Sequence, residues 1–472
     1  MSRAHPAGPR HGDILVAPSL GAPPSDSGEL APGIWPSSTV RDSAGGLVVG
    51  GVAVTDLVAR HGTPVFVLDA DDLRARARSY RTAFAGLSPA GVDVYYAGKA
   101  FLCAAVARWV HAEGLGIDVC SGGELELALR AGVPAERLLF HGNNKSEAEL
   151  AAALTAGVGR IVVDSFDEIE RLSRLAADAG AVAPVLVRVT LGVEAHTHEF
   201  IATAHEDQKF GFSLASGRAL EAVRRVAAEP SLRLVGLHSH IGSQIFVASG
   251  FEVAAHRAVG FAATIRDELG VDVAELNLGG GIGIRYTDAD HPLDIADMAP
   301  ALVGIVAQEC ERRGLAMPRL AFEPGRAIIG PTMLTCYTVG TVKRRTLEGG
   351  GVRHYVSVDG GMSDNIRTAL YDADYTITLA NRVSQAPAAA ARVVGKHCES
   401  GDVVVRDCWL PDDVGVGDLL AVAATGAYNR SMASNYNLVT RPAVVAVSDG
   451  AEQVVLRAET LADLFATDPG LA

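Results

Sequence analysis

Short apolar runs rich in β-branched residues alternate with longer, helix-favouring segments of alanine, leucine, arginine and glutamate from residue 64 onward. This alternation is typical of βα units, in which each strand is followed by a helix that packs on the sheet. The predicted strands are residues 65–68, 92–97, 116–120, 138–141, 161–164, 185–190, 234–238 and 275–278. Eight such runs predict a (β/α)8 TIM-type barrel, whose active site lies at the carboxyl ends of its strands.

A second pattern begins near residue 332, where strand-like runs are separated by glycine and aspartate turns. It predicts a mostly β C-terminal domain over residues 332–472. The run 47–52 also favours β structure, so residues 39–63 are predicted to add a strand to this domain and residues 64–331 to form the barrel. The predicted C-terminal strands include residues 333–343, 355–358, 402–407, 418–423 and 443–447.

Residues 1–38 are rich in proline, glycine, serine and alanine and show no sustained period. Such a composition predicts a disordered N-terminal extension that contributes nothing to a core. Deletion of residues 1–35 is therefore expected to leave activity intact.

The charge and the composition of the chain indicate which kind of molecule it binds. The 472-residue chain carries a net charge of −14 without basic clusters, which argues against nucleic acid or an anionic membrane and favours a small-molecule substrate. No apolar run approaches the roughly 20 residues that span a bilayer, and no signal peptide is evident, so a cytoplasmic protein is expected. The six cysteines lack CxxC spacing, which favours free thiols over disulfides or a zinc site.

Lys99 follows the predicted strand 92–97 after a single glycine. At the carboxyl end of a buried strand a lysine amine can lose its water, and a desolvated amine is a good nucleophile for forming a Schiff base. A solvated strand-end lysine is the alternative, because most lysines are surface charges. Ser121, His141 and His240 lie at the ends of other predicted strands, so polar side chains gather at one end of the barrel.

Two further segments give Lys99 a chemical context. The glycine-rich run 277–283 offers main-chain amides that can hold a phosphate at a helix start, although a tight turn alone would also explain it. The run does not match the GxGxxG pattern of dinucleotide sites. Glu323 ends another apolar run, and a carboxylate can keep the pyridine nitrogen of pyridoxal phosphate (PLP) protonated; a structural ion pair with Arg326 is the alternative. Lysine, phosphate loop and carboxylate together predict PLP as the cofactor.

One predicted connection is unusually long. About twenty residues without a clear period separate the strand 185–190 from Ser213, and loops of this length inside compact domains are usually functional lids or disordered segments. His196 and His198 lie within it, but an HxH pair without a third ligand at suitable spacing is weak evidence for a metal. No metal is predicted.

Seven motifs, in order along the chain, resemble those of the PLP-dependent diaminopimelate decarboxylases, which have the alanine-racemase-like fold of a barrel and a β domain. The resemblance covers about residues 45–460 and implies conversion of meso-2,6-diaminopimelate to L-lysine and CO2, the last step of lysine biosynthesis. The motifs are YAGKA at 96–100, HSHIGSQ at 238–244, LGGG at 278–281, EPGR at 323–326, RTALY at 367–371, CESGD at 398–402 and GAY at 426–428.

The resemblance also implies residue roles. Lys99 resembles the Schiff-base lysine, His240 the imidazole that stacks on the PLP face, and Glu323 the partner of the pyridine nitrogen. Cys398 and Glu399 resemble a pair that enters the site from the other subunit, the thiol as proton donor, which implies a homodimer with shared sites. The other PLP contacts implied are Ser243, Gly280, Gly281, Gly325, Arg326 and Tyr428, and the substrate contacts are Arg326, Arg367, Tyr371, Glu399 and Tyr428.

Rival activities differ in what they require of Arg367. A decarboxylase of ornithine or arginine would have no use for an arginine aimed at a distal carboxylate, and a non-enzymatic PLP carrier would need only Lys99 and the phosphate loop. A racemase would carry a second catalytic base in place of the Cys-Glu pair. Two departures from the family pattern, Thr368 and the segment 372–375, put local loop geometry in question more than specificity.

Overall fold

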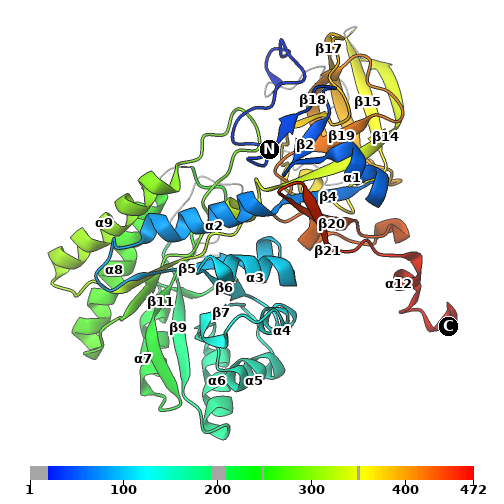
Figure 1. Ribbon diagram of the computed structural model, residues 1–472. Helices are drawn as coiled ribbons and strands as arrows, with labels where there is room; N and C mark the ends of the chain where they lie inside the picture. Colours follow the sequence, from blue (N-terminus) through cyan, green and yellow to red (C-terminus); the bar gives the residue numbers. More distant parts are fainter. Residues whose placement is uncertain (1–19, 193–208, 247–248, 348–350, 472) are drawn as a thin grey trace. The chain divides into compact units, whose positions relative to one another are not determined.

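The computed structural model describes residues 20–192, 209–246, 249–347 and 351–471 (Figure 1). The chain forms two compact units. The barrel unit comprises Arg74–Gly283 and His291–Ile328, and the sheet unit comprises Met1–Leu73, Ile284–Asp290 and Ile329–Ala472. The domain boundaries predicted from the sequence remain predictions.

Eight parallel strands close into the barrel. Each strand pairs with the next, and β13 pairs with β5 while β8 pairs with β9, so the ring has no open edge. The ring consists of β5 (Val92–Ala97), β6 (Gly116–Val119), β7 (Leu138–Phe140), β8 (Arg160–Val163), β9 (Ala183–Thr190), β11 (Leu232–His238), β12 (Glu275–Asn277) and β13 (Arg319–Phe322), with the short β10 (Phe212–Ser213) beside β9. The predicted (β/α)8 barrel is confirmed.

The assignment of the first barrel strand was wrong, and one barrel strand was left out of the prediction. The run 65–68 forms β4 (Val65–Asp69), but β4 pairs with β14 and β20 of the sheet unit and not with any barrel strand. The eighth place in the barrel belongs to β13, which the sequence pattern placed after it. All five residues of β4 are buried, so its apolar pattern identifies a covered strand without showing which sheet covers it.

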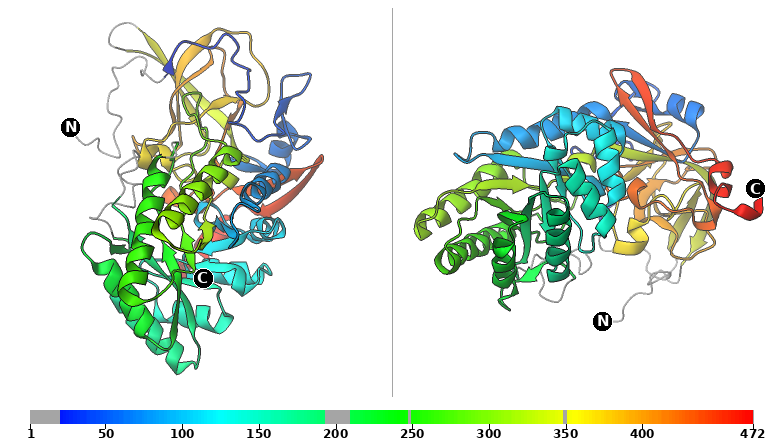
Figure 2. Two further views of the ribbon diagram at one scale, coloured as in Figure 1. Left: turned by 90° about the vertical axis from the view of Figure 1, so that its left-hand side faces the viewer. Right: turned by 90° about the horizontal axis from the view of Figure 1, so that it is seen from below.

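Helices surround the barrel strands (Figures 1 and 2). Three of them begin at a serine whose hydroxyl group accepts the main-chain N–H of a glutamate three residues later: Ser121, Ser146 and Ser165. This pattern satisfies an amide that the helix itself leaves unpaired. The helices are α3 (Ala104–Ala112), α4 (Gly122–Arg130), α5 (Glu147–Ala156), α6 (Phe166–Asp178), α7 (Arg218–Ala228), α8 (Ser249–Leu269) and α9 (Ile295–Arg313), with α2 (Ala70–Phe84) and α10 (Arg326–Ile329) where the chain passes between units.

Apolar side chains fill the barrel interior. A buried cluster inside it takes one residue from each of six strands, as expected for a barrel that is a packed core and not a pore. The cluster comprises Tyr95, Leu139, Val162, Leu186, Val235 and Ala321.

The sheet unit is built on a nine-stranded sheet, which confirms the predicted β-rich second domain. Its strands are β4, β14 (Met333–Thr346), β15 (Val352–Val358), β16 (Ile377–Leu379), β17 (Ala388–Val394), β18 (Val403–Pro411), β19 (Leu419–Val422), β20 (Ala443–Ser448) and β21 (Ala451–Leu456). Its short helices are α1 (Val54–His61), α11 (Arg367–Tyr371) and α12 (Leu461–Phe465).

The N-terminal run 47–52 belongs to the sheet unit but does not join its large sheet. It contributes instead to a separate three-stranded sheet of β1 (Val40–Arg41), β2 (Leu47–Val49) and β3 (Val52–Ala53). No helix among the described residues is long and apolar enough to cross a membrane.

The stretch before residue 38 corrects another expectation. Residues 1–19 lie outside the described residues, but Ile34 and Trp35 are 0% and 5% exposed and belong to the main hydrophobic core of the sheet unit. The composition of residues 1–38 gave no sign that these two apolar side chains are buried. The prediction that residues 1–35 can be removed without effect is therefore withdrawn.

Replacement of Trp35 by alanine is expected to lower the free energy of unfolding by about 3–5 kcal/mol, because a large aromatic ring leaves a cavity in a packed core. Chemical denaturation monitored by circular dichroism measures this change. Val40→Ala, at a side chain that is 54% exposed, serves as the control and should change stability little. Equal stability of Trp35→Ala and the wild-type protein would contradict the role of Trp35 in the core.

Candidate active site

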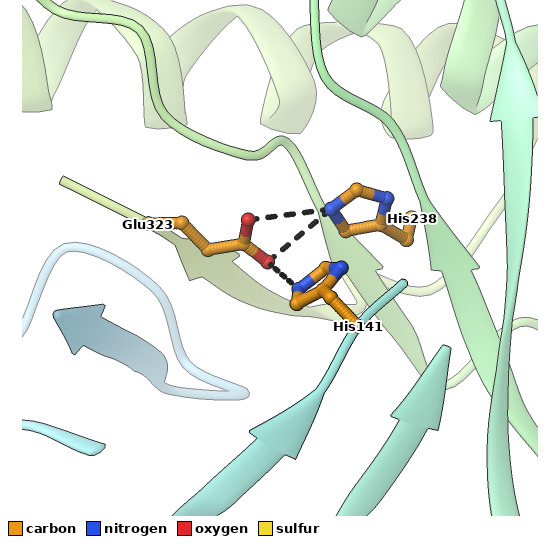
Figure 3. Close-up of side chains that lie close together, drawn as sticks. All are labelled: His141, His238 and Glu323. Atoms are coloured by element: carbon orange, nitrogen blue, oxygen red, sulfur yellow. Dashed lines mark hydrogen bonds and ion pairs between the residues drawn. The ribbon is translucent and has the colours of Figure 1, made fainter. Parts of the chain in front are cut away.

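Glu323 lies directly after β13, at the carboxyl end of the barrel, and is only 5% exposed. His141 and His238, from the ends of β7 and β11, both point toward its carboxylate (Figure 3). His141 Nε2 lies 2.9 Å from Oε1, and His238 Nε2 lies 3.2 Å from Oε1 and 3.3 Å from Oε2. The amide of Asn277, at the end of β12, donates to Oε1 at 2.7 Å. Side chains at the ends of three barrel strands, β7 and the adjacent pair β11 and β12, thus hold one carboxylate.

This environment keeps Glu323 ionised. Burial alone would raise the pKa of its carboxyl group, but the electrostatic attraction of His141 and the hydrogen bonds from His141 and His238 outweigh burial and hold that pKa well below its ordinary value. Burial lowers the pKa of His238 to about 4, so its imidazole is neutral near pH 7 and serves as a hydrogen-bond donor. A buried, permanently negative carboxylate stabilises a proton on any basic nitrogen that approaches it.

The same three side chains would suit a metal by residue type. Their ligating atoms lie within 4.8 Å of one another. However, Oε1 of Glu323 already accepts the Asn277 amide, and a ligating histidine would have to turn a lone pair, not an N–H group, toward the carboxylate. We therefore interpret the cluster as a hydrogen-bonded carboxylate.

This interpretation predicts the response to chelation. Dialysis against EDTA, followed by dialysis with PLP, is expected to leave catalytic activity unchanged, and elemental analysis should find less than about one equivalent of zinc per chain before dialysis. Loss of activity that added zinc restores would show that the cluster is a metal site.

Lys99 follows β5 in a single 3-10 turn, Gly98–Ala100. Its charge acts on both Asp118, the last residue but one of β6, and His240, which follows β11, so the three groups share one end of the barrel. Lys99 is exposed in the single chain, so the expectation that its amine is buried is wrong for this structure. Burial raises the pKa of Asp118, beside His141, to about 6.

The glycine run forms a tight loop with no room for side chains. A Cβ atom on Gly280 would lie 2.1 Å from the carbonyl oxygen of Glu323, and one on Gly281 would lie 2.2 Å from that of Gly242. Gly281 also has a φ of +108°, which favours glycine. No helix follows the loop before α9 begins at Ile295, so the expected phosphate site at a helix start is wrong in that respect.

His240 contacts this glycine loop. The main-chain N–H of Gly280 donates to His240 Nδ1 at 3.3 Å, which leaves the proton of a neutral ring on Nε2. Burial of the ring and the positive charges of Lys99 and Arg188 hold the pKa of His240 well below its ordinary value. A neutral, oriented imidazole at this position is suited to stacking on a flat ligand.

Ser243 and Arg326 are brought together beside the loop. The hydroxyl oxygen of Ser243 accepts hydrogen bonds from Nη2 and Nε of Arg326 at 3.0 and 3.3 Å. Gly325 is packed against Ala97, where a Cβ atom would lie 2.9 Å from the alanine Cβ. All the barrel residues predicted to bind the cofactor therefore lie on the loops that follow β5, β11, β12 and β13.

The remaining predicted residues belong to the sheet unit. Arg367 begins α11 and is 6% exposed, and Tyr371 ends the same helix half-buried. Tyr428 is half-buried with a φ of +62°, a conformation that is uncommon for a side chain of its size. Cys398 is exposed and Glu399 half-buried.

Asp402 fixes the segment that carries Cys398 and Glu399. Its carboxylate accepts the main-chain N–H groups of His397 at 2.8 Å and Met362 at 2.6 Å. Glycines at 361 and 395 make room for it, since a Cβ atom at either position would lie within 2.5 Å of an Asp402 oxygen. The exposed thiol thus projects from a loop whose backbone is well anchored.

Comparisons with known proteins agree with these features. A family model described as "Pyridoxal-dependent decarboxylase, pyridoxal binding domain" matches residues 70–330. A diaminopimelate decarboxylase of Mycobacterium tuberculosis is 57% identical over 443 residues, 93% of this chain and 98% of the relative. The chain belongs to the diaminopimelate decarboxylases.

Solved structures support membership of this family. The crystal structure of diaminopimelate decarboxylase from M. jannaschii with L-lysine matches at a TM-score of 0.85 and 31% identity, covering 92% of this chain and 99% of that one. A lysine/ornithine decarboxylase from Vibrio vulnificus with putrescine matches less closely, at a TM-score of 0.69 and 25% identity, covering 84% and 97%.

The site residues fit the cofactor of the pyridoxal-dependent decarboxylases. Among the described residues, Oε2 of Glu323 has only the 3.3 Å contact from His238, so it can accept a further proton donor such as a protonated pyridine. The amides of Gly280 and Gly281 are free of side chains, as a phosphate-binding loop requires.

Sequence reasoning missed two of the three partners of Glu323 in this diaminopimelate decarboxylase. His238 ends a predicted barrel strand and Asn277 is the last residue but one of another, and that position was the available signal. His141 was noted at a strand end without a role, and the hydroxyl group of Ser121 caps α4. His196 and His198 lie outside the described residues.

Proposed function

We propose that this chain decarboxylates meso-2,6-diaminopimelate to L-lysine and CO2, with PLP as cofactor, in the last step of lysine biosynthesis. Family membership at 57% identity supports the reaction class. The observation that carries the choice of substrate is the environment of Arg367.

Arg367 is a buried cation that has no acidic partner within the described part of the chain. The residue is 6% exposed, and no described carboxylate lies within 4.0 Å of its guanidinium group. The groups that favour its charge are the tyrosines 286, 375 and 428. A buried charge is costly unless it is paired, so the missing counter-charge is best supplied by an anionic ligand. A substrate with a second carboxylate provides it.

The barrel residues would bind and activate PLP. Lys99 is the amine that would attach it, Glu323 would keep a proton on the pyridine nitrogen, and His240 would stack on the ring. PLP, when bound, supplies the electron sink that accepts the electron pair left by departing CO2. The amides of Gly280 and Gly281, with Ser243, Gly325, Arg326 and Tyr428, would hold its phosphate and fix its orientation.

The sheet-unit residues would complete the reaction. Arg326, Arg367, Tyr371, Glu399 and Tyr428 would bind the substrate, and the Cys398 thiol would return a proton to the carbon that has lost CO2. Because Cys398 is exposed on an anchored loop, we propose that it serves the active site of a second subunit, in a homodimer with shared sites. A cytoplasmic location is proposed with this role.

A CO2-release assay tests the proposal. Purified enzyme with PLP is offered meso-diaminopimelate, L-ornithine, L-arginine and L-lysine at equal concentrations. Release from diaminopimelate alone is expected. Faster release from ornithine or arginine would favour the basic-amino-acid decarboxylases, which the Vibrio structure represents, and no release from any substrate would favour a PLP carrier.

A further inference from the structure

Two tyrosines enclose the guanidinium group of Arg367. Nη1 of Arg367 donates to the hydroxyl oxygen of Tyr375 at 2.6 Å, and Cζ lies 4.8 Å from the ring centroid of Tyr286 and 5.6 Å from that of Tyr375. The two rings meet edge to face, with centroids 5.3 Å apart at 84°. Tyr286 comes from the short segment Ile284–Asp290 of the sheet unit, far from Arg367 in sequence.

The hydrogen bond continues beyond Tyr375. Its hydroxyl group donates to Oδ1 of Asn429 at 3.2 Å, and Nδ2 of the fully buried Asn429 donates to the carbonyl oxygen of Thr425 at 3.1 Å. Asn429 directly follows Tyr428, so the loop that carries Tyr428 and the guanidinium of Arg367 are fixed by one chain of hydrogen bonds. The orientation of Arg367 therefore depends on Tyr375.

This arrangement leaves the binding edge of Arg367 available. Within the described part of the chain, Nη1 makes the hydrogen bond of Arg367, and neither Nε nor Nη2 makes one. The Nε and Nη2 groups form the planar fork that binds a carboxylate with two parallel hydrogen bonds. Fixing a flexible arginine before the ligand arrives removes the entropic cost of ordering it on binding.

We propose that Tyr286 and Tyr375 are positioning residues that hold Arg367 with this edge ready for a carboxylate, and so set the preference for ligands that carry a distal carboxylate group. The proposal rests on the proposed function, in which Arg367 binds that group. It assigns a role to Tyr375, which lies in the segment 372–375 that departs from the family pattern.

A pair of ligands isolates the carboxylate. L-lysine retains one carboxylate of diaminopimelate, the one distal to the bond that is cleaved, and 1,5-diaminopentane is the same molecule without it. Isothermal titration of the PLP-loaded enzyme with each ligand gives two dissociation constants, whose ratio reports the carboxylate contact. Arg367→Ala is expected to bring this ratio close to one.

Tyr375→Phe keeps the ring and removes the hydroxyl group. Affinity for L-lysine is expected to fall by about tenfold, the effect of losing one hydrogen bond to a charged group, while affinity for 1,5-diaminopentane changes by less than about twofold. Tyr355→Phe, at a half-buried tyrosine on β15, is the matched control and should change neither constant.

The ring of Tyr286 is tested separately, so that the proposal stands or falls even if Tyr375→Phe does not fold. Tyr286→Leu removes the aromatic face and is expected to weaken L-lysine binding selectively, by about fivefold, and Tyr286→Phe is expected to restore it. Thermal denaturation of each variant is recorded beside the titrations.

The outcomes separate this inference from the proposed function. Equal losses for both ligands, or no loss for either, in Tyr375→Phe would overturn the positioning role while wild-type CO2 release from diaminopimelate stands. A wild-type enzyme that binds L-lysine more tightly than 1,5-diaminopentane yet releases no CO2 would overturn the proposed function. The positioning role of Tyr286 and Tyr375 would then still stand.

Discussion

Lys99→Ala is expected to abolish both CO2 release and the visible absorbance that a PLP–lysine adduct gives. Lys145 is another lysine near this end of the barrel, but its amine is already bound by other groups. Its side chain is 1% exposed, and its Nζ lies 2.7 Å from Glu168 Oε1 and donates to the carbonyl oxygens of Gly142 and Val162. A lysine held by three buried partners is not free to replace Lys99 as a nucleophile.

Absorbance spectra and borohydride reduction followed by mass spectrometry measure the loss. Lys343→Ala, at an exposed lysine on β14, is the control and should keep the spectrum and the activity of the wild-type enzyme. A reducible PLP adduct that persists in Lys99→Ala would show that another amine holds the cofactor.

Mixing two inactive variants is expected to restore activity. If Cys398 acts in the partner's site, a hybrid dimer of Lys99→Ala and Cys398→Ala chains has one site with both lesions and one with neither. Random exchange at equal concentrations makes about half of the dimers hybrids, so about a quarter of all sites should be intact. Activity near a quarter of the wild-type value is therefore expected.

Differently tagged chains and tandem purification verify that subunits have exchanged before activity is measured. If each site took Lys99 and Cys398 from one chain, no hybrid would contain an intact site. Absence of activity after proven exchange would therefore rule out shared sites, and mixing Lys99→Ala with itself gives the baseline.

The sequence predicted the fold class of each unit correctly, but it did not predict correctly which strands belong to which sheet. The continuous apolar run of β4 indicates a strand that is buried on both faces. The pairing of Leu68 with Met333 and Ala446 depends on residues far away in the sequence, which no local pattern contains. For the same reason β13 was separated from the barrel that it completes. The strand β17 was not predicted, because its first four residues are alanines, which have little intrinsic preference for strands.

For the candidate site, too, the sequence predicted one part and not another. Motif resemblance identified Glu323 and Arg367, whose chemistry is evident from residue type. Their surroundings were hidden, since His238, Asn277 and Tyr286 reach them only through the fold. Neighbours that are distant along the chain decide whether Glu323 is ionised and whether Arg367 is rigid, and single-sequence patterns carry no record of such neighbours.

The place of β4 in the sheet has a consequence for biosynthesis. β4 leaves the ribosome early, but its partners β14 and β20 are made only after the whole barrel. A buried apolar strand without its partners is open to mispairing and aggregation until they arrive. The barrel strands pair mostly with neighbours in sequence, so the barrel can form during this interval while the sheet unit waits for the last third of the chain. Nascent chains stalled before residue 333 should therefore be the ones that most require chaperones.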